Sequence, residues 1–122
     1  MPHVVFDKKI DLELLSKNFQ PIFQKEPFLI RIQDIFVNKQ KNSCIIPTLV
    51  IDSIHQEFII EIFAKEKKST LRLHPRTDPE KTDGVKTAMG LVAKLILSIF
   101  EDSRIIQTNI QDFIPKRIIN MA

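Results

Sequence analysis

The start of the chain, Met1-Pro2-His3, offers a residue that can do acid–base chemistry. Methionine before proline is normally removed, because the residue behind it is small, and its removal leaves a free secondary amine on Pro2. Burial and neighbouring cations both lower the pKa of such an amine. A base with a pKa near neutral suits proton abstraction next to a carbonyl group. If Met1 is retained, the Pro2 nitrogen is an amide, and Pro2 merely begins a strand.

Two arginines stand where they would assist such a base. Arg31 lies early in a predicted strand, and Arg76 lies in the loop before the longest predicted helix. Guanidinium groups bind carboxylates in a bidentate way and stabilise a developing enolate. The alternative for Arg31 is a surface or interface charge. Arg76 stands against the dipole of the helix that follows, which favours a functional reason for its position.

The strands that would hold these residues follow from hydrophobic patterning. Strand-like runs cover residues 2–6, 28–37, 44–51, 57–64 and 104–110. The alternation slips at Gln33-Asp34, which indicates a bulge. Pro47 favours an edge position or a bulge for its strand. The nearly continuous apolar run at 57–64 is typical of a strand buried on both faces.

Two helices are predicted between these runs. Asp11 is suited to cap the first, whose apolar spacing continues to Phe23. The second covers residues 78–100, with Asp78 as its cap and one apolar stripe. Gly84 and Gly90 inside it lower stability unless another segment packs closely against them.

The order of these elements predicts one α/β domain over residues 1–122, which is an ordinary size for a single domain. Two β-α-β units would form a four-stranded sheet with both helices on one face. Each crossover would join parallel strands and be right-handed.

Four short motifs resemble the 5-carboxymethyl-2-hydroxymuconate isomerase family in the same order along the chain. They are Met1-Pro2-His3-Val4-Val5, Leu29-Ile30-Arg31, Arg76-Thr77 and Ser103-Arg104-Ile105-Ile106. That family belongs to the tautomerase superfamily, whose mature chains begin with proline. The resemblance implies a β-α-β homotrimer in which Pro2 moves a proton between carbons of a dienol acid. It implies that Arg31 and Arg76 bind substrate carboxylates or the enolate oxygen, with Phe36 as the aromatic wall.

The chain departs from the family just before the long helix. The family approaches its arginine through a glycine-containing segment, whereas this chain has Leu73-His74-Pro75 after a charged insert. Arg72 is therefore an alternative to Arg76 for the substrate-binding role.

We therefore expect a cytoplasmic isomerase that needs no cofactor. Its substrate would be a small unsaturated 2-oxo or 2-hydroxy carboxylic acid, of the kind met in the degradation of aromatic compounds. The alternative is a non-catalytic trimeric binding or structural module on the same fold.

Composition argues against other classes of protein. Cys44 is the single cysteine, so no intrachain disulfide forms, and no cluster has metal-ligand spacing. The apolar runs are too short to span a membrane, so no membrane partner is expected. The net charge of +3 is a mild excess. Nucleic-acid binding ranks last, because the candidate lysines lack interleaved aromatic residues. Those lysines are Lys39, Lys41, Lys65, Lys67 and Lys68.

Overall fold

The computed structural model describes residues 1–115, which form eight strands, two α-helices and one short 3-10 helix. The strands are β1 (His3–Phe6), β2 (Ile22–Gln24), β3 (Leu29–Ile32), β4 (Phe36–Val37), β5 (Ser43–Ile51), β6 (His55–Ala64), β7 (Ser69–Leu73) and β8 (Ile105–Thr108). The helices are α1 (Leu12–Asn18), α2 (Asp83–Ile99) and the 3-10 helix η1 (Gln111–Phe113). Within residues 1–115, no helix is long and apolar enough to cross a membrane.

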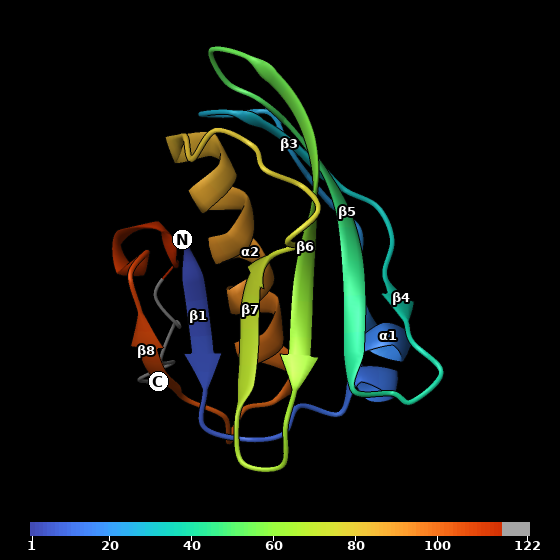
Figure 1. Ribbon diagram of the computed structural model, residues 1–122. Coiled ribbons are helices and arrows are strands. Elements are labelled where there is room, and N and C mark those ends of the chain that lie inside the picture. The colour runs from blue at the N-terminus through green and yellow to red at the C-terminus, as the bar shows by residue number, and fades with distance from the viewer. Residues whose placement is uncertain (116–122) are drawn as a thin grey trace, which may run out of the picture.

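The strands make one curled sheet that wraps around α2 (Figure 1). Their order is β2-β3-β5-β6-β7-β1-β8, and β4 pairs with β5. Every pairing in this part of the chain is antiparallel. The amino-terminal strand β1 lies between β7 and β8, which holds it in the sheet along both edges.

The predicted four-stranded sheet with two β-α-β units and both helices on one face is wrong. The polar segments at 38–42, 52–54 and 65–68 are hairpin turns, and hairpins place consecutive strands side by side and antiparallel. The middle of the chain therefore needs no helical crossover. The connection through α1 leads from β1 to β2, at the opposite end of the sheet. The connection through α2 leads from β7 to β8, with β1 between them.

Both helices were predicted too long at one end. Asp11 does cap α1, because its side chain accepts a hydrogen bond from the backbone N–H of Leu14 at 3.1 Å. The helix ends at Asn18, and the apolar spacing beyond it belongs to β2. The second helix is capped by Thr82 instead of Asp78, so residues 78–82 are part of the loop that precedes it.

The slip in alternation at Gln33-Asp34, predicted as a bulge within one strand, is a break between two strands, because β3 ends at Ile32 and β4 begins at Phe36. Pro47 lies in β5, which has neighbours on both sides, so it is not at an edge. Its position falls between the pairings of β5 with β3 and with β4. A missing N–H costs little there, since the neighbouring strand is interrupted at that point.

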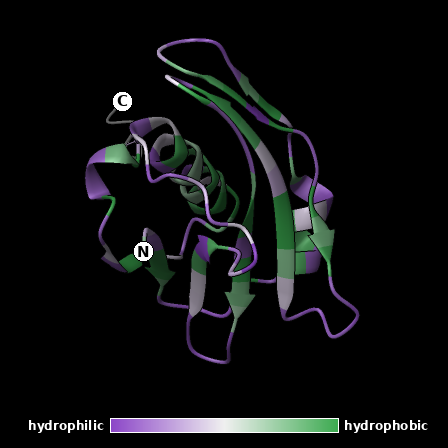
Figure 2. Ribbon diagram, turned by 45° about the horizontal axis from the view of Figure 1, so that its top comes forward, coloured by the Kyte–Doolittle hydropathy of each residue, from purple (hydrophilic) through white to green (hydrophobic). Residues whose placement is uncertain are grey.

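One face of α2 and the inner face of the sheet form the core. We call inner the face that touches α2, and outer the face turned away from it. The helix buries a stripe of Val85, Ala88, Met89, Val92, Ala93 and Ile96. The inner face supplies fully buried side chains on five strands, among them Val4, Ile30, Ile46, Ile60 and Leu71. Hydrophobic residues follow the strands and α2, and hydrophilic ones the turns (Figure 2). β6 is buried on its inner face and only partly covered on the outer one.

Both glycines of α2 lie where another segment approaches closely. A Cβ at Gly90 would stand 1.9 Å from the carbonyl oxygen of Phe113, so η1 packs directly on the helix backbone there. A Cβ at Gly84 would stand 2.5 Å from Oδ2 of Asp52. The sequence indicated that glycine inside this helix lowers stability unless another segment packs closely against it. These contacts are such close packing.

Asp52, in the turn between β5 and β6, holds the amino terminus of α2. Its carboxylate accepts hydrogen bonds from the backbone N–H of Gly84 at 3.1 Å and of Ile54 at 3.3 Å. Partial desolvation raises the pKa of this carboxyl. The hydrogen bonds from Thr82, Ile54, Gly84 and Ser53 outweigh that effect and leave the pKa below its ordinary value. The ionised form of Asp52 therefore ties the β5–β6 hairpin to α2.

We predict that Gly90→Ala lowers the stability of the fold. Alanine favours a helix by about 1 kcal/mol over glycine, but overpacking against a backbone carbonyl costs about 1–3 kcal/mol. Urea unfolding followed by circular dichroism measures the difference. Lys94→Ala, an exposed change on the same helix, should alter the midpoint little. A higher midpoint for Gly90→Ala would contradict the close packing of η1 on α2.

We also predict that Asp52→Asn lowers stability near neutral pH, by about 1 kcal/mol, as for loss of a helix cap. A carboxyl whose pKa falls on folding stabilises the folded state above its unfolded pKa, about 3.9. That contribution disappears as the pH falls through the lower folded pKa. The two proteins should therefore differ near neutral pH and converge toward about pH 2. A gap that stays constant over this range would show that the charge of Asp52 is not what matters.

Candidate functional site

The outer face of the sheet carries most of the side chains that the sequence singled out. The helix α2 covers the inner face, and antiparallel sheets of this kind often leave the other face open. Alternation along each strand sends Arg31, Phe36 and Arg72 outward, because their neighbours in sequence are buried. The outer face of β5 is largely apolar, and that of β6 mixes apolar with polar side chains. The apolar ones are Ile45, Pro47, Leu49, Ile51, Ile59 and Phe63, and β6 also turns His55, Glu57 and Glu61 to this face.

Arg31 stands beside an aromatic ring at one end of this face. Strand register puts it directly between Phe23 on β2 and Leu49 on β5. Its guanidinium carbon lies 5.3 Å from the centre of the Phe23 ring, and the amine of Lys25 lies 5.8 Å from the same ring. Both distances suit a cation–π contact. The ring itself is 54% exposed.

Phe36 lies on the same face at the other end of β5. It pairs with Ile45, four residues along β5 from the partner of Arg31, or about 13 Å at strand spacing. Its ring is 52% exposed. The two half-exposed rings of Phe23 and Phe36 therefore flank the apolar part of β5.

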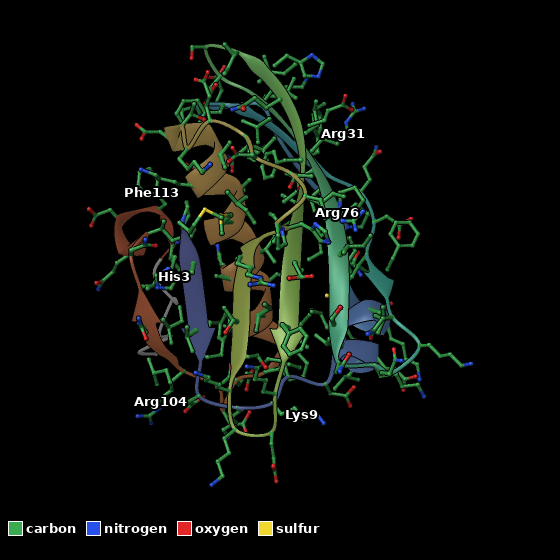
Figure 3. All side chains as sticks on the ribbon, viewed as in Figure 1. His3, Lys9, Arg31, Arg76, Arg104 and Phe113 are labelled. Carbon is green, nitrogen blue, oxygen red and sulfur yellow. The ribbon has the colours of Figure 1, made fainter. Side chains whose placement is uncertain are left out.

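Arg76 reaches this face from the loop between β7 and α2. Its backbone N–H donates to Nδ1 of His74 at 3.1 Å, and the ring of His74 lies beside the outward-facing Glu61. Arg76 and Arg31 lie toward β5 and β6 in Figure 3, far from His3 on β1. Neither arginine makes an ion pair with any residue from 1 to 115.

Arg72, the alternative to Arg76, belongs to a separate polar cluster. Its Nε donates to Oε1 of Glu61 at 2.8 Å, and Nε2 of His74 lies 3.8 Å from Oε2 of the same carboxylate. The side chain of Glu61 is only 12% exposed. Arg72 therefore neutralises Glu61 and has less freedom to bind a ligand than Arg76 has.

Pro2 lies just before β1, near the opposite edge of the sheet from Arg31. Alternation with the outward-facing His3 turns Pro2 toward the inner side, where it is buried. The carbonyl of Met1 accepts a hydrogen bond from Nδ2 of Asn109 at 2.8 Å, and Nδ1 of His3 lies 2.9 Å from it. Arg72 is the arginine nearest in register, because it pairs with His3.

The predicted site residues thus divide into two groups. Arg31 and Phe36 share the outer face along β5, and Arg76 stands in the loop beside β6. Pro2 directly precedes β1, and four strand spacings separate β1 from the β3 strand of Arg31, which is about 19 Å along the sheet. One chain does not bring the proposed base and Arg31 together.

Two elements of this surface were missed from the sequence. Phe23 was assigned to the end of a helix, although Pro21 directly before Ile22 was a reason to end the helix earlier. The contact of Glu61 with Arg72 depends on the β6–β7 register. The charged turn at 65–68 could have set that register, had it been recognised as a hairpin.

Other candidates for chemistry have little support in the described residues. Cys44 is buried on the inner face, and desolvation raises the pKa of its thiol to about 12, so it is not a nucleophile near neutral pH. No group of three or more His, Cys, Asp or Glu side chains within residues 1–115 is arranged to hold a metal ion.

Comparison of the chain with family models, with curated proteins and with solved structures finds no match. The function therefore has to be argued from the outer face itself.

Proposed function

We propose that the protein is a non-catalytic binding module that takes an anionic macromolecule on the outer face of its sheet. The observation that carries this proposal is the placement of Arg31 beside the exposed ring of Phe23, with the exposed Phe36 ring at the other end of β5 and the exposed Arg76 in the loop next to β6. Neither arginine has an ion-pair partner among residues 1–115. An unpaired arginine beside apolar surface is available to an incoming carboxylate or phosphate.

The shape of the surface favours a large partner. Sites for small molecules are usually concave and enclose most of the ligand. Two hollows found among the described residues lie elsewhere. One, of about 920 Å³, is lined by β8, η1 and the end of α2. The other, of about 400 Å³, lies at the start of α2 beside Asp52. The outer face presents its arginines on an open sheet.

We predict that Arg31→Gln combined with Arg76→Gln weakens retention on immobilised heparin, a polyanion without aromatic groups. The matched control is Lys9→Gln combined with Arg104→Gln, which removes the same charge from exposed residues away from β5 (Figure 3). The first variant should elute at clearly lower salt than the second. Equal losses in both would mean that only net charge matters and would refute the outer face as an anion-binding site.

Proton transfer by Pro2 in an isomerase, and assembly into a homotrimer, stay predictions of the sequence. Two observations bear on them. Arg72 is the nearest arginine in register but is bonded to Glu61. Arg31 would have to come from a neighbouring subunit, because it is about four strand spacings away in the same chain.

If the protein is an isomerase that uses Pro2, the following results are expected. The intact mass of the protein from its native host should be that of the chain without Met1, and sedimentation should show a trimer. The processed protein should convert an aryl pyruvate between its enol and keto forms. Pro2→Ala should then lower kcat/KM at least about a hundredfold, as expected for loss of a general base. Retention of Met1, or full activity of Pro2→Ala, would rule out Pro2 as the base.

A further inference from the structure

The outer face offers two separate aromatic platforms for stacking. The Phe23 and Phe36 rings are about half exposed, and they come from strands on the same side of β5. Base–aromatic stacking contributes substantially to the binding of single-stranded nucleic acids and tolerates any sequence. Together with the apolar outward positions of β5 between them, the two rings form one exposed apolar stretch, and such a stretch marks an interaction surface.

Cations stand next to the Phe23 platform and next to a third ring, that of Phe63. Arg31 and Lys25 flank the Phe23 ring, and Lys65 lies 5.7 Å from the ring of Phe63 on the same face. Glu61 is neutralised by Arg72. Glu57 is the remaining acidic side chain on the outward positions of β2 to β7, and it pairs across the strands with Leu49, the neighbour of Arg31.

From this arrangement we infer that the outer face binds single-stranded nucleic acid. Arg31 and Arg76 contact phosphates, and bases stack on Phe23 and Phe36. The inference rests on the proposed function, since it names the anionic partner of the same surface. A single-stranded nucleic acid matches both the arginines and the exposed rings, because each nucleotide brings an anionic phosphate and an aromatic base. An acidic protein matches only the arginines.

The sequence argued against a nucleic-acid partner because its lysines lack interleaved aromatic residues. The interleaving arises across strands instead. Phe23 and Arg31 are separated by eight positions in sequence, and the β2–β3 hairpin makes them direct neighbours.

The test measures fluorescence anisotropy with labelled twelve-nucleotide strands of oligo(dT) and oligo(U), and with an abasic strand of the same length and charge. Wild type should bind both base-bearing strands more tightly than the abasic strand. Phe23→Leu and Phe36→Leu should each weaken binding to the base-bearing strands at least about fivefold and leave abasic binding unchanged. Ile106→Ala, an exposed apolar change on β8, is the control and should change neither.

Charge variants test the phosphate contacts. Arg31→Gln with Arg76→Gln should lower the magnitude of the salt slope, log K against log salt, by about 1.4 for two lost phosphate contacts on a single strand. Glu57→Gln should tighten binding, because it removes an acidic charge that lies on this face two strands away from Arg31.

The outcomes separate the two claims. If wild type binds base-bearing and abasic strands equally, or if polyglutamate competes as well as oligo(dT), the nucleic-acid inference is wrong, while arginine-dependent heparin retention keeps the anion-binding face. If heparin retention does not depend on Arg31 and Arg76, both claims fail. Tighter binding of oligo(U) than of oligo(dT) would identify RNA as the ligand, and the reverse would identify DNA.

Discussion

The packing of α2 inside the curl of the sheet is the interaction on which the rest of the structure depends. The helix buries a stripe from Val85 to Ile96 against side chains of strands at both sides of the sheet. Full burial of one such side chain contributes about 1.5–3 kcal/mol, so this contact dominates the stability of a chain of this size. Gly84 and Gly90 let the β5–β6 turn and η1 approach the helix backbone. The missing side chains therefore permit the close packing of both segments on the helix.

Packing against α2 determines which residues can stand on the inner face of the sheet. It places no such constraint on the residues of the outer face. A half-covered antiparallel sheet is stable with polar residues on its open side, in the common alternation of apolar and polar positions. Here four of the five outward positions of β5 are apolar, namely Ile45, Pro47, Leu49 and Ile51. Packing against α2 does not explain why these residues are apolar, because their side chains point away from the helix. Their presence between two half-exposed phenylalanines is the reason to treat the outer face as an interaction surface.

The sequence predicted the existence of several elements better than their arrangement. The strand at the start of the chain, the Asp11 cap, the end of α2 and the break after Ile32 are local features, and each has a local signal. The sheet topology is not local. A strand, a helix and a second strand can be a crossover or can lead to a distant edge of the sheet, and the residues of the helix do not distinguish the two. The hairpin turns carried the missing information. Treating the turn at 65–68 as a hairpin places β7 antiparallel to β6 and removes the second β-α-β unit as predicted.

The candidate site shows the same limit at the level of single residues. Arg31, Arg76 and Phe36 were singled out because arginine binds anions and phenylalanine offers an aromatic wall, and all three side chains are exposed. Pro2 was chosen in the same way, yet β7 and β6 lie between its strand and β5. Which residues are neighbours in a sheet depends on strand order and register, and these follow from the pairing of the whole chain. Residue types therefore indicated what kind of group the protein could bind. Only the pairing of β2 with β3, and of both β3 and β4 with β5, indicated which of those residues can bind it together.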